Sequence, residues 1–190
     1  MSKVTIQGDA SGTGIFTIAS PNSNTDRTLV LPDEAGTVLT TAGVPASAMP
    51  AGSVIQVVQG TTETVTSTSS TSYVSTALNA SITPSSASSK IIILATSSFW
   101  HSQANYGGFF SLFRGDHTGT NLFSATGGGD WYGNNSIIRS PFSLHYVDSP
   151  STTSSTTYTV CMKSESASFT VYSPVQSGAK GVIILMEIAA

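Results

Sequence analysis

Residues 73–82 read Tyr-Val-Ser-Thr-Ala-Leu-Asn-Ala-Ser-Ile, a stretch in which apolar and polar side chains alternate. The side chains that share one face of an extended chain are Val74, Thr76, Leu78, Ala80 and Ile82. The same period of two recurs in Phe142-Ser143-Leu144-His145-Tyr146, where His145 is expected to face away from the core, and in residues 158–162. Such alternation is typical of a strand with one face on a core and the other toward water. These stretches predict antiparallel β-structure.

Five further stretches complete the predicted strands: residues 53–59, 90–95, 109–113, 168–172 and 181–188. Residues 90–95, Lys-Ile-Ile-Ile-Leu-Ala, are apolar after the lysine, as expected of a strand covered on both faces. The Ser- and Thr-rich tract at residues 61–72 is either an edge strand or a loop. Roughly eight strands separated by turns, with no convincing helix, predict an all-β fold, a two-sheet sandwich of the jelly-roll kind.

The first 50 residues differ from the rest of the chain. Their apolar segments, at residues 15–18, 29–31 and 37–40, are short and separated by turn residues. Together they cannot bury enough apolar area to offset the entropy of ordering the chain, so this segment must obtain a core from other chains or from a docking surface. We therefore expect residues 1–50 to be an anchor, shaft and linker, and residues 51–190 to be a β-sandwich head. The candidate anchor side chains are Ile15, Phe16, Ile18, Leu29, Leu31, Val38 and Leu39.

Composition argues against several classes of function. Only 9% of the residues are charged, the formal net charge is −3, and seven Lys and Arg residues do not build a nucleic-acid surface. No apolar run approaches the ~20 residues that span a bilayer, and the N-terminus lacks the apolar core of a secretory signal. We expect synthesis in a cytoplasm and no membrane insertion. The lone Cys161 rules out an intrachain disulfide and is expected to be a small buried apolar side chain.

Two stretches resemble a known group of proteins. Residues 11–18, Ser-Gly-Thr-Gly-Ile-Phe-Thr-Ile, lead to residues 27–41, Arg-Thr-Leu-Val-Leu-Pro-Asp-Glu-Ala-Gly-Thr-Val-Leu-Thr-Thr. This pattern resembles the shaft segment of many phage tail fibre and virion structural proteins. Residues 82–91 and the terminal residues 184–189 are similar to the C-terminal head of small phage fibre proteins, including those of marine phages.

The resemblance implies a homotrimeric β-structured appendage on the virion surface, made in the host cytoplasm. Residues 1–50 would bind other virion proteins of the tail or the capsid, and the head would be exposed. Two roles remain open within this class. A tail fibre would present its tip to a host polysaccharide, whereas a capsid decoration protein would stabilise the shell without a receptor. The resemblance supplies no catalytic residues.

Two aromatic clusters in polar, glycine-rich surroundings are candidate glycan-binding residues. Their members are Trp100, His101, Tyr106, Asp130, Trp131, Tyr132 and Asn134. Sugars stack an apolar face on an aromatic ring while their hydroxyls bind acids and amides, and such residues concentrate on loops. In the alternative interpretation, the two tryptophans belong to the core or to an interface between subunits.

Other site chemistry is poorly supported by the sequence. The three histidines, His101, His117 and His145, show no tight metal-ligand spacing. The chain has no Gly-x-Ser-x-Gly motif, and Gly-Gly-Gly-Asp at residues 127–130 lacks the lysine of a phosphate-binding loop. We therefore predict a non-enzymatic protein without cofactor or metal. A free carbohydrate-binding module or a depolymerase is the alternative from another class.

Overall fold

The computed structural model describes residues 11–15, 22, 24–26, 28, 48–123, 128–132 and 138–190, apart from the side chains of residues 129–131. The chain divides into two units, Met1–Val38 and Leu39–Ala190. Among the predicted anchor side chains, Ile15 is described and is 94% exposed. The others, which are Phe16, Ile18, Leu29, Leu31, Val38 and Leu39, lie outside the described residues. The anchor role and the boundary at residue 50 therefore stay predictions.

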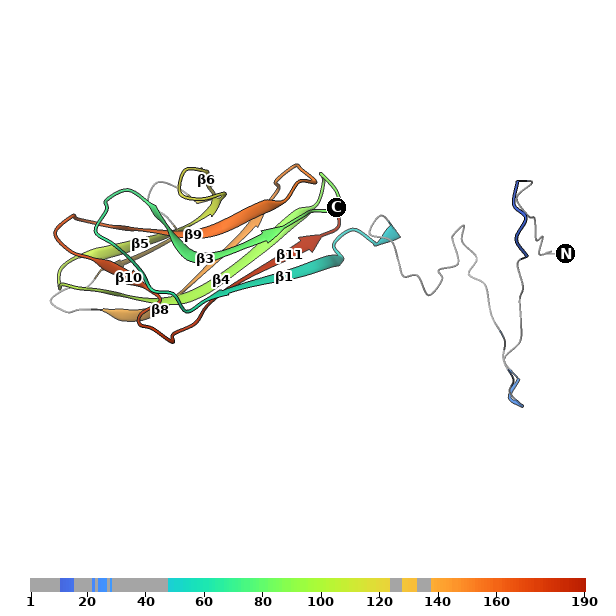
Figure 1. Ribbon diagram of the computed structural model, residues 1–190, viewed down its shortest axis with the longest axis horizontal. Helices are drawn as coiled ribbons and strands as arrows, with labels where there is room; N and C mark the ends of the chain where they lie inside the picture. Colours follow the sequence, from blue (N-terminus) through green and yellow to red (C-terminus); the bar gives the residue numbers. More distant parts are fainter. Residues whose placement is uncertain are drawn as a thin grey trace. The chain divides into compact units, whose positions relative to one another are not determined.

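The second unit contains two antiparallel sheets (Figure 1). Sheet A has the order β1-β11-β4-β10-β2, with β8 on the other edge of β4. Its strands are β1 (Val54–Thr62), β2 (Thr66–Thr68), β4 (Lys90–His101), β8 (Arg139–Asp148), β10 (Val171–Ser173) and β11 (Gly181–Ile188). Sheet B has the order β3-β9-β5-β6, and β7 also pairs with β5. Its strands are β3 (Val74–Ile82), β5 (Gly107–Arg114), β6 (Thr120–Asn121), β7 (Gly129–Tyr132) and β9 (Thr156–Ser164).

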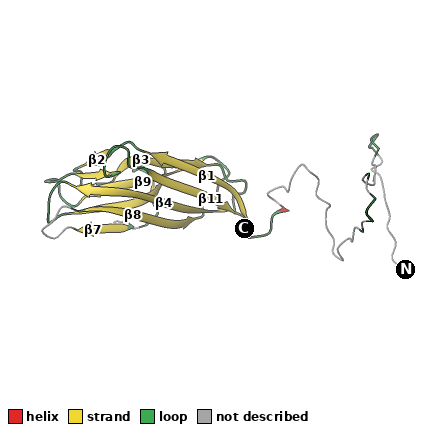
Figure 2. Cartoon of the chain, turned by 90° about the horizontal axis from the view of Figure 1, so that it is seen from below, coloured by secondary structure: helices red, strands yellow, loops and turns green. Residues whose placement is uncertain are grey.

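The strand predictions agree with this architecture. Each of the eight predicted stretches overlaps a strand, and the described residues contain no α-helix and only a short 3₁₀ segment at Ala48, so the all-β prediction is confirmed (Figure 2). The undecided tract at residues 61–72 holds the end of β1 and the short β2. The short strands β6 and β7 were not predicted, because neither has an alternating apolar pattern long enough to stand out from a loop.

The core lies between the inner faces of the two sheets. The alternating residues of β3 point inward as predicted, and Leu78 and Ile82 are almost completely buried. An aromatic cluster joins the sheets, because Phe110 of sheet B stacks on Phe142 of sheet A at 4.2 Å between ring centroids. Phe99 of sheet A lies 5.2 Å from the same Phe110 ring. Full burial of such a side chain contributes roughly 1.5–3 kcal/mol to the free energy of folding, so this cluster is a main source of stability for the packing of the two sheets.

Strand β4 departs from its prediction. Ile91, Ile93 and Ala95 are fully buried, but Ile92 and Leu94 point to the outer face of sheet A and are only partly covered. The expectation that this strand is covered on both faces is therefore wrong for the single chain. The physical reason is the two-layer architecture. Sheet B covers one face of β4, and no layer formed by the described residues covers the other face.

The two ends of the sandwich differ in what they carry. At the proximal end, the Gly52 amide donates to the Ala189 carbonyl at 2.8 Å, and the Ala189 amide donates to the Ser53 carbonyl at 2.9 Å. These bonds hold the start of β1 beside the C-terminus (Figures 1 and 2). At the distal end, β4 finishes and β5, β8 and β10 begin. The chain therefore enters the sandwich at the end opposite to the predicted aromatic clusters.

Candidate functional site

Trp100 lies on the outer face of sheet A at the distal end. Its indole stacks on Tyr172 of β10 at 4.3 Å between centroids and 7° between planes. The guanidinium carbon of Arg139, from β8, lies 5.5 Å from the Trp100 ring centroid. Because β8 and β10 flank β4 on opposite edges, the indole is held between a cation and an aromatic ring. A sugar could stack on Trp100 only by displacing one of these neighbours.

His101 faces the opposite way and is fully buried. Its Nδ1 contacts the Gln103 carbonyl, and its Nε2 accepts the Ile138 amide hydrogen at 3.4 Å. A neutral imidazole that donates from Nδ1 satisfies both contacts. Adjacent residues of a strand point to opposite faces, so Trp100 and His101 do not share a surface site. The sequence placed both in a loop, but they end strand β4, and His101 anchors the loop that follows it.

The remaining predicted glycan-binding residues are only partly described. Tyr106 stacks on Phe169 at 4.6 Å and is half-buried. Asp130 and Trp131 lie on β7, which pairs with β5, and their side chains lie outside the described residues, as does Asn134. Tyr132 is 54% exposed. The fold brings Tyr106, Asp130, Trp131 and Tyr132 toward one end of the sandwich, and their role in binding a glycan, like that of Asn134, stays a prediction.

A shallow pocket of about 310 Å³ lies beside Trp100, and sequence reasoning missed it. Its lining residues are Ser98, Arg139, Ser140, Pro141, Val175 and Gln176. The Val175 amide donates to the Ser98 hydroxyl at 3.1 Å, and the Ser173 hydroxyl donates to the Ser98 carbonyl at 3.0 Å. No local signal could reveal this pocket, because pairing of distant strands brings its walls together.

Arg139 and Gln176 give this pocket its chemical character. Neither side chain has a hydrogen-bond or ion-pair partner within the described part of the chain, and Arg139 is exposed. A guanidinium offers a fork of N–H donors that matches a carboxylate, and an amide offers both donors and an acceptor. The serine hydroxyls and the apolar surfaces of Pro141 and Val175 complete a wall that suits a polar ring with one negative charge.

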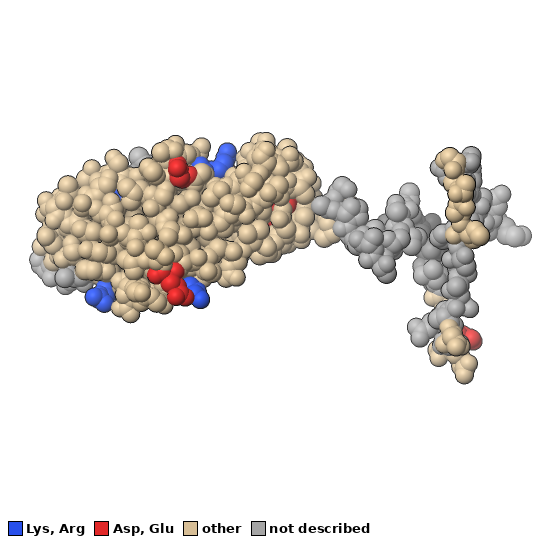
Figure 3. All heavy atoms as spheres, in the orientation of Figure 1, with Lys and Arg blue, Asp and Glu red and all other residues tan. Residues whose placement is uncertain are grey.

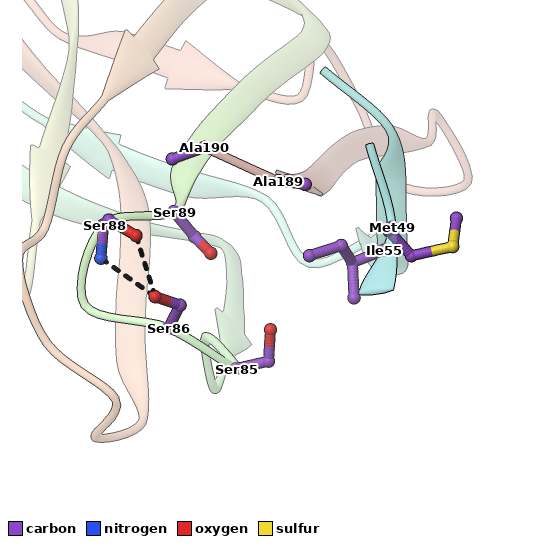
Figure 4. A pocket seen from close by; sticks show the side chains of 8 residues that line it. All are labelled: Met49, Ile55, Ser85, Ser86, Ser88, Ser89, Ala189 and Ala190. Carbon is purple, nitrogen blue, oxygen red and sulfur yellow. Dashed lines mark hydrogen bonds between the residues drawn. The ribbon is translucent and has the colours of Figure 1, made fainter. Parts of the chain in front are cut away.

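A second pocket, of about 280 Å³, lies at the proximal end (Figure 4). Its lining residues are Met49, Ile55, Ser85, Ser86, Ser88, Ser89, Ala189 and Ala190. Figure 4 shows the serines on the loop between β3 and β4, across from Met49 and Ile55. The Ser86 hydroxyl contacts the Ser88 hydroxyl at 2.8 Å and accepts the Ser88 amide hydrogen at 3.2 Å. The loop therefore satisfies much of its own hydrogen-bonding capacity.

Glu187 holds this serine loop from inside. Its carboxylate is fully buried and accepts hydrogen bonds from the Ser85 amide, the Ser85 hydroxyl and the Ser89 hydroxyl, each at 2.7 Å. Its other oxygen accepts the Gln56 side-chain amide. Burial alone would raise the pKa of Glu187, but the bonds from Gln56, Ser85 and Ser89 outweigh it, and the pKa lies below its ordinary value. This carboxylate is a structural brace for the proximal end.

A buried polar cluster links the two sheets elsewhere in the core. Asp148 of β8 accepts two hydrogen bonds from Arg114 of β5, at 2.8 and 2.7 Å. The hydroxyl of Tyr158 on β9 donates to the same carboxylate at 2.7 Å. The bond to Asp148 raises the pKa of Arg114, and burial followed by this bond raises the pKa of Tyr158. All three groups satisfy one another, so the cluster fastens sheet A to sheet B.

A serine and a histidine also meet on the surface. The Ser75 hydroxyl lies 3.1 Å from His117 Nδ1 and accepts the His117 amide hydrogen at 3.0 Å. A nucleophilic pair needs a third group that orients the base. The adjacent Asp116 instead binds the Thr118 hydroxyl and amide, and these bonds lower its pKa.

The lone Cys161 is buried, as the sequence predicts. Burial raises the pKa of its thiol to about 12.

No protein-family model and no curated protein matches the chain. Within the described ranges, no three His, Cys, Asp or Glu side chains gather closely enough to hold a metal ion. The described residues also contain no helix with the length and apolarity to cross a bilayer.

Proposed function

We propose that this chain is a structural protein of a phage virion, a homotrimeric fibre or spike joined to the particle by its first 50 residues. The observation that carries the proposal is that the two ends of the second unit differ. The chain enters at the proximal end beside the C-terminus, whereas the aromatic side chains, Arg139 and their pocket lie at the distal end. A head attached in this way presents its distal end outward. The shaft-like motifs at residues 11–18 and 27–41 support the same conclusion.

The strand order supports a jelly roll as the architecture of the head. Four strands of sheet A run in the order β1-β11-β4-β8, and four strands of sheet B run in the order β3-β9-β5-β7. Along the chain, these eight strands change sheet at every step except from β5 to β7. Alternation of this kind generates the two interlocked Greek keys of a jelly roll, an architecture common in viral capsid and lectin domains.

Within this role, the distal pocket contacts an acidic sugar of the host surface. Arg139 binds the sugar carboxylate, Gln176 and the serines bind hydroxyls, and Pro141 and Val175 contact the ring. The test uses the full chain with an oligogalacturonate, and a neutral malto-oligosaccharide as the comparison. We expect Arg139→Ala to weaken oligogalacturonate binding by at least about tenfold, because one charge-assisted contact is worth ~1.5–3 kcal/mol. Lys180→Ala removes the same charge from an exposed site and is the matched control.

Location on the particle tests the structural role itself. Antibodies against the head should label purified phage particles, at the tail if the chain is a fibre and over the shell if it is a decoration protein. Absence of label from purified particles would overturn the virion assignment. Release of reducing sugar from host envelope by the purified chain would instead favour the depolymerase alternative.

A further inference from the structure

The outer face of sheet A carries an apolar row that crosses four strands. Strand register places Val57 of β1 beside Met186 of β11, Met186 beside Ile92 of β4, and Ile92 beside Val147 of β8. Val57 is 59% exposed and Val147 is 56% exposed, although both are apolar. Ile92 and Met186 between them are only partly covered. A continuous exposed apolar row of this kind is a mark of an interaction surface.

Two neighbouring rows extend the surface without adding charge. The next row toward the distal end is Gln59, Ile184, Leu94 and His145, and the row after it is Thr61, Val182, Thr96 and Ser143. None of the twelve positions in the three rows is Lys, Arg, Asp or Glu. In the view of Figure 3, charged side chains on the second unit are few. The three rows define what we call the apolar face.

We infer that the apolar face is the surface through which identical copies of this chain pack together. This inference rests on the self-association proposed above and names the residues that produce it. A face without Lys, Arg, Asp or Glu can meet its own copy without repulsion between such side chains, and closed symmetry is the usual arrangement of identical chains. The distal pocket lies beyond the last row of the apolar face, because Trp100 is four residues, or roughly 13 Å, past Thr96 along β4.

The apolar composition of β4 supports a second layer on this side. A continuous run such as Ile91 to Ala95 is typical of a strand that is buried on both faces, but sheet B covers one face only. Packing of a neighbouring copy against Ile92 and Leu94 would cover the other. The sequence feature that the single chain leaves unexplained is thus accounted for by the assembly.

The size of the apolar face fits the centre of a specific interface. Four strands about 4.8 Å apart and five residues of about 3.4 Å each give a footprint of roughly 330 Å². A standard interface buries about 800 Å² per partner, with an apolar centre and a polar rim. The apolar face therefore supplies about two fifths of such an area. Gln59, Thr61 and Ser143, at the margins of the face, suit the start of the rim.

The test compares the mass of the full chain and of three variants by sedimentation at micromolar concentration. Val57→Lys and Val147→Lys each place a charge in the apolar row at a position that the single chain leaves more than half exposed. Asn79→Lys places the same charge on an exposed position of β3 in sheet B and is the matched control. We expect the wild type and Asn79→Lys to be trimers and both valine variants to have dissociation constants raised at least about a hundredfold.

The outcomes separate the interface from the self-association on which it rests. If the wild type is a trimer and both valine variants remain trimers, the apolar face is not the interface and the trimer stands. If the wild type is a monomer, both ideas fail. Far-UV circular dichroism and the urea midpoint check that the variants fold. Dissociation of Asn79→Lys to the same extent as the valine variants would also overturn the assignment.

Discussion

Replacing Glu187 with glutamine is expected to destabilise the head, because the buried carboxylate is the common acceptor of the proximal end. The glutamine side-chain oxygen can still accept the bonds from Ser85 and Ser89. Its NH₂ group, however, would face the NH₂ group of Gln56, which now donates to the carboxylate. The variant therefore exchanges one charge-assisted bond for two opposed donors, and it weakens the others by removing the charge.

The expected loss follows from these contacts. A hydrogen bond to a charged group contributes about 1.5–3 kcal/mol, and a buried donor left without an acceptor costs about 1–3 kcal/mol. Ser85 is exposed and can recover its bonds from water, so it adds little. We expect a loss of about 2–4 kcal/mol in the free energy of unfolding, a large share of the ~5–15 kcal/mol that is typical of a domain.

The pH dependence of the free energy of unfolding tests the role of Glu187 independently. The folded-state pKa of Glu187 is lowered, whereas an unfolded glutamate titrates near about 4.3. The stabilisation is therefore fully present above the unfolded pKa and is lost as the pH falls through the lower folded pKa. The wild type should lose this contribution below about pH 4.3, and Glu187→Gln should lack this component of its acid sensitivity.

Urea unfolding followed by tryptophan fluorescence measures both effects. Glu63→Gln is the matched control, because Glu63 forms an ion pair with Lys180 in which both side chains are more than half exposed. Such pairs contribute at most about 1 kcal/mol. A loss below about 0.5 kcal/mol in Glu187→Gln, or a loss equal to that of Glu63→Gln, would refute the reasoning about buried acceptors.

Three further predictions concern the core. Asp148→Asn should lower the free energy of unfolding by about 3 kcal/mol in urea titrations, the lower end of the range for broken buried pairs, because Arg114 is one-third exposed; a loss below about 1 kcal/mol would contradict this. Cys161 should not react with a thiol reagent until urea unfolds the chain, and rapid labelling of the native protein would show that its burial is wrong. Gly60→Ala should destabilise by about 1–3 kcal/mol, because the added Cβ would lie 2.1 Å from a backbone oxygen of β3, whereas Gly14→Ala, with nothing within 4 Å, should leave the urea midpoint unchanged.

The strand predictions succeeded where the side-chain pattern is local. Alternation in residues 73–82 and in residues 142–146 depends only on which face of a strand meets the core, and each residue contributes to that pattern directly. His145 is exposed beside the buried Leu144, as the alternation predicts. The short β6 and β7 were missed because they exist through their pairing with β5, not through a pattern of their own.

The candidate site was predicted less well, for a physical reason. Trp100 and His101 were grouped by their proximity in the sequence, yet a strand directs neighbouring side chains to opposite faces. The pocket of Arg139 and Gln176 could not be predicted at all, because no local pattern reports that the ends of β8 and β10 flank the same strand.

The amino-acid sequence by itself determined the all-β class, the positions of the long strands and the poverty of charge, because each follows from residue type and a period of two. The tertiary structure alone decided which strands became neighbours. That pairing placed Arg139 against Trp100, and it aligned Val57, Met186, Ile92 and Val147 in one row. Contacts between residues far apart in the chain depend on sheet topology and register, which local propensity does not encode.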